Sequence, residues 1–233
     1  MKKTFLAALL LSAGGLALAP LANANLISIA ASNTSNPTGA KSVQASGTSP
    51  FGYIAPPASL GTLAGISSLS ISGTGTPPLA EPALSSSTID VVATAPTTLY
   101  VWVTETGLTA PAAQLLSSFT ANKCVPLGSC GGNVTESTFL STSNALYTGT
   151  SLSTSPNFDV TSLGTMADTA SVPTLSAPYS ITEEYVMTFT VAGGDQNNTI
   201  SISRVPEPGS LLLLGTALIG IGAVGFARRR RRA

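Results

Sequence analysis

Apolar and polar residues alternate over short stretches along the middle of this chain. The clearest case is residues 181–191, in which one set of positions is apolar: Ile181, Tyr185, Met187, Phe189 and Val191. Successive side chains point to opposite faces of a strand, so this run predicts a half-buried β-strand. A loop at residues 193–198 separates it from a second alternating run at residues 200–203. We expect the two runs to form an antiparallel hairpin.

Comparable runs recur along the body of the chain. Alternating patterns occupy residues 89–94 and 99–104, and shorter strand candidates occur at residues 27–31, 66–72, 115–121 and 134–140. The 16 prolines and 22 glycines of the chain divide it into short pieces, which disfavours long helices. The pattern predicts an all-β fold, an antiparallel β-sandwich of jelly-roll or immunoglobulin-like type. Residues 33–50 are rich in Ser, Thr and Gly, and we expect a mobile loop there.

The first residues have the organisation of a secretory signal peptide. Lys2 and Lys3 precede an apolar run at residues 5–18, and Ala22 and Ala24 place small side chains where a signal peptidase reads them. We therefore predict a signal peptide at residues 1–24 and a mature protein that starts at Asn25.

The last residues have the organisation of a membrane span. Residues 210–227 carry no charge, and a helix of that length, rising about 1.5 Å per residue, is about 27 Å long, enough to cross the hydrocarbon core of a bilayer. Five cationic residues follow: Arg228, Arg229, Arg230, Arg231 and Arg232. Cationic flanks stay in the cytoplasm, so we expect this cluster to stop transfer and the body at residues 25–204 to lie outside.

A short proline-containing motif stands immediately before this apolar segment: Val205, Pro206, Glu207 and Pro208. The order of motif, apolar span and arginine cluster at residues 205–233 resembles the PEP-CTERM sorting signal of Gram-negative exported proteins, many of whose producers make extracellular polysaccharide. The resemblance implies recognition by an exosortase, removal of the helix, and release or transfer of the body. The alternative is a permanent single-pass anchor. Residues 67–72, 99–108 and 178–190 also resemble PEP-CTERM ectodomains, which implies a shared β-rich fold and no activity.

Charge and composition narrow the function of the body. Residues 25–204 contain three basic and nine acidic side chains, a net charge of −6, which argues against nucleic-acid binding. The chain has no histidine, so it lacks the commonest general base and the commonest metal ligand. We expect no cofactor, no metal and no catalysis. Glu183 and Glu184 are adjacent and point to opposite faces of their strand, and we expect one solvated acid and one near an edge.

Two further residue pairs are of interest. Tyr100 and Trp102 stand two apart on one predicted strand, so their rings should lie side by side, either as a platform for sugar rings or, as a lone tryptophan more often does, as part of the core. Cys124 and Cys130 are the only cysteines. Export would bring them into an oxidising compartment, so we predict a disulfide between them.

These patterns together predict a non-catalytic protein of the cell surface or extracellular matrix. Its expected partners are signal peptidase, an exosortase and, transiently, the membrane, with the inner membrane as an intermediate location. The alternative function is a carbohydrate-binding module of the exopolysaccharide matrix.

Overall fold

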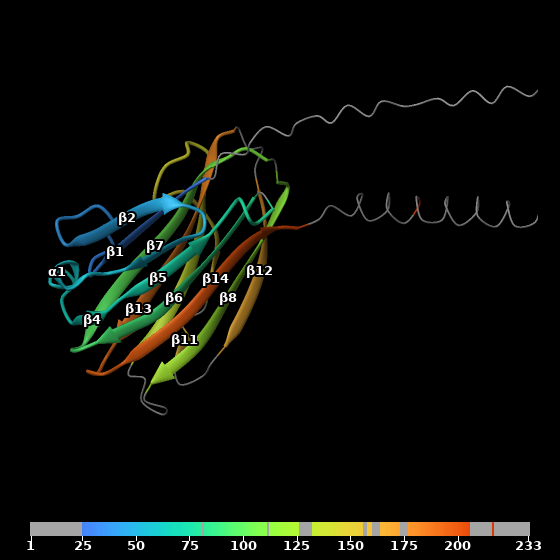
Figure 1. Cartoon of the computed structure of the whole chain (residues 1–233). Helices are drawn as coiled ribbons and strands as arrows, with labels where there is room; N and C mark the ends of the chain where they lie inside the picture. Colours follow the sequence, from blue (N-terminus) through green and yellow to red (C-terminus); the bar gives the residue numbers. More distant parts are fainter. Residues whose placement is uncertain are drawn as a thin grey trace, which may run out of the picture.

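A computed structural model describes residues 25–80, 82–110, 112–125, 132–155, 158–159, 164–172 and 177–205, together with Thr216. In these parts β-strand is the main secondary structure, and the one helical element is short, α1 (Pro57–Leu60). The strands form two antiparallel sheets that face each other (Figure 1). The all-β prediction is confirmed.

Sheet A contains the strands that carry most of the large apolar side chains. Its order is β10 (Thr150–Thr154), β9 (Gly132–Ser141), β13 (Tyr179–Phe189), β7 (Thr97–Leu108), β1 (Leu26–Ser32) and β2 (Ser42–Thr48), with β11 (Phe158–Asp159) also paired to β9. Every pairing is antiparallel, and Glu184 of β13 lies opposite Trp102 of β7 on one side and Ser137 of β9 on the other. This register fixes the outer face discussed below.

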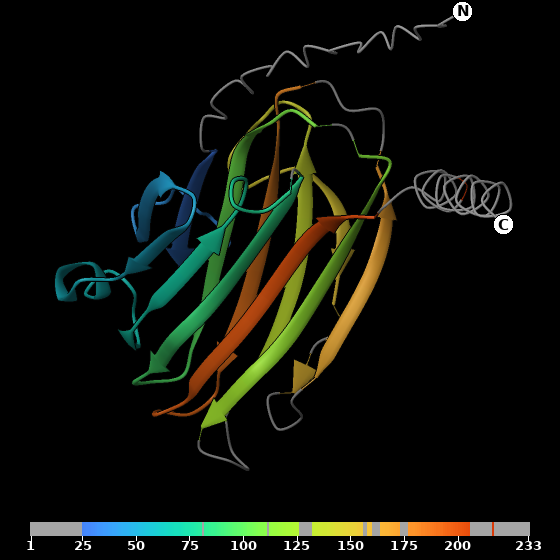
Figure 2. The ribbon, with the colours of Figure 1, turned by 45° about the vertical axis from the view of Figure 1, so that its right-hand side comes forward.

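Sheet B lies in front of sheet A in the turned view (Figure 2). Its order is β12 (Thr165–Ser171), β8 (Gln114–Val125), β14 (Asp195–Arg204), β6 (Ala83–Ala93), β5 (Ser70–Thr74) and β3 (Phe51–Ile54), with β4 (Ile66–Ser68) also paired to β6. β12 is largely exposed, as suits a strand at the edge of a sheet.

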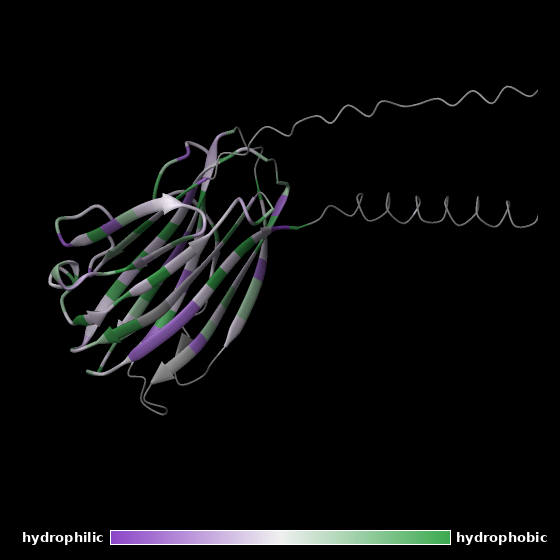
Figure 3. Cartoon of the chain, viewed as in Figure 1, coloured by the Kyte–Doolittle hydropathy of each residue, from purple (hydrophilic) through white to green (hydrophobic). Residues whose placement is uncertain are grey.

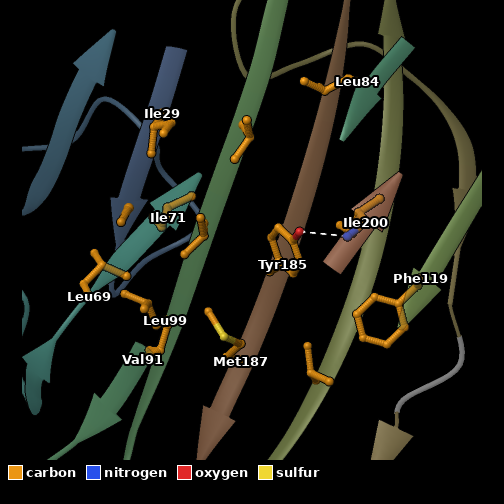
Figure 4. Packing of buried hydrophobic residues seen from close by; sticks show 14 of the residues in the cluster. Ile29, Leu69, Ile71, Leu84, Val91, Leu99, Phe119, Tyr185, Met187 and Ile200 are labelled. Atoms are coloured by element: carbon orange, nitrogen blue, oxygen red, sulfur yellow. Dashed lines mark hydrogen bonds between the residues drawn. The ribbon is translucent and has the colours of Figure 1, made fainter. Parts of the chain in front are cut away.

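The hydrophobic core fills the space between the sheets. Alternating apolar and polar positions are visible along the strands (Figure 3), and the apolar set of β13 is fully buried at Ile181, Tyr185 and Met187. Facing them from sheet B are side chains such as Phe119 of β8 and Ile200 of β14 (Figure 4). Burial of these side chains stabilises the fold by roughly 25 cal/mol per Å² of apolar surface removed from water.

The predicted hairpin of residues 181–191 with 200–203 is wrong. β13 belongs to sheet A and pairs with β7 and β9, whereas β14 belongs to sheet B and pairs with β6 and β8. The connection crosses from one sheet to the other, so the two apolar faces meet across the core. Alternation identifies the inward face of a strand, but two inward faces can meet equally well side by side or across a sandwich.

The predicted mobile loop at residues 33–50 is also wrong in part, because it contains β2. This strand pairs with β1 over its whole length, from Ser42 opposite Ser32 to Thr48 opposite Leu26. Its only well-buried apolar side chain is Val43. An edge strand is held by backbone hydrogen bonds to one neighbour, and its side chains therefore need little apolar character.

Among the described residues, no helix has the length and apolar character to cross a membrane. The predicted span at residues 210–227 lies outside these residues except for Thr216, which is helical.

Candidate functional site

A small pocket lies on the outer face of sheet A, on the side that faces away from the core. Its floor comes from three neighbouring strands, through Trp102 of β7, Glu184 of β13 and Phe139 of β9. Two loops form its walls, at residues 147–149 and at Ser35 and Pro37. Its volume is about 150 Å³, similar to that of a cavity that holds one benzene-sized molecule.

Trp102 is buried, with 3% of its surface exposed, but it is not a member of the core cluster between the sheets. Its ring stacks on that of Tyr100, with 5.8 Å between ring centroids and 11° between planes. The rings therefore lie side by side, as the spacing predicts. Neither alternative describes Trp102 fully, because it lies on the outer face like a platform residue and is covered like a core residue.

Tyr147 has an unusual backbone conformation, with φ of 57°. A bulky residue rarely adopts positive φ, which costs about 1–3 kcal/mol and persists only where other contacts enforce it. The amide N–H of Tyr147 donates to Thr104 Oγ1 at 3.2 Å, and its side chain hydrogen-bonds to Ser28 on β1. Burial raises the pKa of the Tyr147 phenol to about 12. These contacts hold the side chain across the outer face of β7.

Glu184 supplies the only charge in the pocket lining. Burial raises the pKa of its carboxyl group, and a hydrogen bond with the Trp102 side chain lowers it in part. The carboxylate is therefore incompletely hydrated when ionised. It would gain free energy from a positive charge placed near it.

A cluster of hydrogen-bonded polar side chains lies inside the core, centred on Glu183. Its carboxylate accepts a hydrogen bond from the Ser86 hydroxyl of β6, which lies 2.8 Å from the Tyr185 hydroxyl. The Tyr185 hydroxyl donates to the Ser86 carbonyl and accepts from the amide of Ile200 at 2.9 Å, the bond drawn in Figure 4. Burial, with smaller contributions from nearby glutamates, raises the pKa of Glu183 well above its ordinary value. The network connects the centres of the two sheets.

Glu136 of β9 extends this cluster of polar side chains. Its Oε1 accepts a hydrogen bond from Ser117 at 3.2 Å, and its backbone amide donates to Ser155 Oγ at 2.8 Å. Its Oε2 has no hydrogen-bond partner among the described residues. Burial is the main reason that the pKa of Glu136 rises from 4.5 to about 7. The core thus contains acids that stay protonated well above their usual range.

The environments expected for Glu183 and Glu184 are wrong, although the two side chains do point to opposite faces of their strand. Glu183 is fully buried on β13, a strand with a neighbour on each side, and Glu184 is partly buried in the outer pocket. Neither is a solvated surface acid. The sequence did carry the signal for Glu183, because it lies midway between Ile181 and Tyr185 on the apolar set of positions.

Most of the other predicted site residues lie outside the described residues. This is so for Ala22, Ala24, Cys130, the motif from Pro206 to Pro208, and the arginine cluster. The backbone of Cys124 lies in β8, and its predicted disulfide stays a prediction. Val205 follows β14, and its amide donates to the carbonyl of Gln114 at 3.2 Å.

A scan of the sequence against models of known protein families found no match, and a search of curated proteins found no significant match.

Proposed function

We propose that this chain is a non-catalytic exported protein of a Gram-negative bacterium, held in the inner membrane by its C-terminal segment until an exosortase cuts it near residues 205–208. The body then reaches the cell surface or the extracellular matrix. The basis is the order of Val205, Pro206, Glu207 and Pro208, the apolar segment, and the arginine cluster.

The extent of the folded body is the observation that supports this division of the chain. Asn25, the predicted mature start, already belongs to the fold, because its amide donates to the carbonyl of Thr76 at 3.1 Å. At the other end, Val205 still hydrogen-bonds to Gln114. The sandwich therefore fits between the two predicted signals.

The same geometry bears on where a cut would fall. Residues 206–209 can span at most about 14 Å when fully extended. Before processing, the body would therefore sit close to the membrane surface, within reach of an integral-membrane enzyme. A cut after Val205 would leave β14 and the hydrogen bond from Val205 to Gln114 intact, so the sandwich could be released without unfolding.

The absence of catalysis is part of the proposal. The chain has no histidine, and the described residues contain no group of three acidic or cysteine side chains placed to hold a metal ion. Glu183 is enclosed in the core, where a substrate would have to displace packed side chains. A structural or binding role fits these features better than a reaction.

The finer classification of the sandwich, as jelly-roll or immunoglobulin-like, stays part of the proposal.

The carbohydrate-binding alternative also stays a proposal, but it has less support, because Trp102 is only 3% exposed and offers no open ring to a polysaccharide.

A triple substitution separates a cleaved signal from a permanent anchor. We expect the wild-type chain, in a host with an exosortase, to lose its C-terminal segment and leave the membrane fraction. Changing Pro206, Glu207 and Pro208 to alanine should leave membrane insertion intact, because these residues lie outside the hydrocarbon, but should block the cut. Intact-mass measurement on medium and membrane fractions reports the result.

The matched control is Pro96→Ala, in the exposed turn between β6 and β7, which removes a proline far from the motif and should leave processing unchanged. Wild-type protein that stays wholly in the membrane with Arg228 to Arg232 attached would overturn the proposal.

A further inference from the structure

The outer pocket of sheet A has an unusual combination of side chains. Three of its lining residues are aromatic and one is a carboxylate: Trp102, Phe139, Tyr147 and Glu184. The others are small or uncharged: Ser35, Pro37, Thr148 and Gly149. No lysine or arginine contributes to the lining, so the only formal charge at the site is negative.

The aromatic rings approach the site from different directions. One face of the Trp102 ring is covered by Tyr100, which lies two residues earlier on the same face of β7. Tyr147 lies beside β7 and β1, since its amide donates to Thr104 and its side chain hydrogen-bonds to Ser28, the residue opposite Thr104 on β1. Trp102 is only 3% exposed, so it borders the pocket with a small part of its surface.

The floor and the walls of the pocket are held in place by the fold. Glu184 lies directly opposite Trp102 in the ladder of β7 and β13, and a hydrogen bond joins the two side chains. Gly149 packs so closely on the Leu140 carbonyl that any side chain there would overlap it. The loop at residues 147–149 is therefore fixed against β9 and keeps Tyr147 over the pocket.

We infer that this pocket binds a small organic cation, a quaternary ammonium or a protonated amine, against the rings of Tyr147 and Phe139, beside Trp102, with Glu184 as its counter-ion. The negative faces of aromatic rings attract cations, and aromatic cages recognise quaternary ammonium groups in this way. A volume of about 150 Å³ admits one ammonium head group and excludes a folded polymer. The inference concerns the body alone and does not rest on the sorting proposal.

Other ligand classes fit the pocket less well. An anion would meet the carboxylate of Glu184 without a basic residue to offset it. A sugar ring stacks on an open aromatic face, but Trp102 is enclosed between Tyr100 and the pocket walls. A neutral apolar ligand would cover the partly buried carboxylate without offsetting its charge.

The chain itself offers a direct probe, because Trp102 is its only tryptophan. We expect titration of the purified protein with choline, at millimolar concentrations, to change the tryptophan fluorescence in a saturable way. The neutral isostere 3,3-dimethylbutan-1-ol has the same shape without the charge, and it should bind at least about tenfold more weakly, as expected for loss of one charge contact. Isothermal titration calorimetry provides the affinities independently of the fluorophore.

Glu184→Gln keeps the shape of the side chain and removes its charge, so it should weaken choline binding about tenfold or more and abolish the preference over the neutral isostere. The control is Asp168→Asn, which removes the same charge from an exposed position on β12 of sheet B and should leave binding unchanged. If circular dichroism shows that Glu184→Gln is misfolded, Phe139→Leu removes a ring and keeps apolar volume, and should also weaken binding.

Three results would overturn the inference. The first is equal binding of choline and its isostere. The second is unchanged choline affinity in a folded Glu184→Gln variant, or in Phe139→Leu if the first variant does not fold. The third is absence of a saturable response to choline, whether or not a simple sugar such as glucose produces one.

Discussion

Neutralising Glu136 should change how the stability of this protein depends on pH. The Glu136 side chain is fully buried, and burial raises its pKa from 4.5 to about 7. In the unfolded chain the carboxyl group returns to its ordinary pKa. Glu136→Gln keeps an oxygen that can accept the hydrogen bond from Ser117 and removes the proton that Glu136 binds.

The direction follows from proton binding. Between pH 4.5 and pH 7 the folded protein holds a proton on Glu136 that the unfolded chain has lost. Stability therefore falls as the pH rises through this window, because the native state binds more protons. A pKa change from 4.5 to about 7 corresponds to about 3 kcal/mol, fully present as stabilisation below pH 4.5 and lost by about pH 8. The Glu136→Gln variant should not lose stability in this way as the pH rises.

Urea unfolding followed by Trp102 fluorescence, repeated from pH 4.5 to pH 8, measures the effect. Glu183 titrates in both proteins, so the difference between the two stability curves reports mainly on Glu136. We expect this difference to change by about 3 kcal/mol in favour of Glu136→Gln as the pH rises. Ser117→Ala should move the loss of stability to higher pH, because the Ser117 hydrogen bond lowers the pKa of Glu136. Parallel curves for wild type and Glu136→Gln would refute the reasoning.

Two further predictions concern parts of the chain that export should alter. The disulfide of Cys124 with Cys130 should leave no free thiol in denatured, unreduced protein and add about 2 kcal/mol at most, because the loop is short; two thiols per chain would exclude it. Removal of the signal peptide should place the α-ammonium of Asn25 near buried Glu105, since the Asn25 side chain donates to Glu105 at 3.0 Å. Protein that starts at Asn25 should therefore be about 1–3 kcal/mol more stable in urea than the same body with two extra N-terminal residues, and Glu105→Gln should reduce the gain. Equal urea midpoints for the two forms would contradict the charge contact.

The sequence predicted the strands better than their partners. Alternation at residues 181–191 identified β13 and its inward face as far as Phe189, because a two-residue period is a local property of the chain. Alternation at residues 99–104 identified β7 but left its inward face open, because both faces of that run are apolar. Pairing is not local. β13 and β14 are neighbours in sequence and lie in different sheets, and only the packing of whole faces decides between a hairpin and a crossing. The outer pocket was beyond prediction for the same reason, since it brings Trp102 together with Glu184 and Tyr147 from separate parts of the chain.

The buried acids are a different case, because their burial follows from the same two-residue period. Glu105 follows Val101 and Val103 on the inward set of β7, and Glu183 lies between Ile181 and Tyr185 on that of β13. A strand cannot turn one side chain outward without a bulge that shifts every later residue to the other face. Once the apolar residues fix the inward face, the glutamates in phase with them must enter the core. At Glu136 and Glu183 the cheaper state is the protonated, hydrogen-bonded one, which is why a raised pKa and neighbouring hydroxyl groups occur together at these two residues.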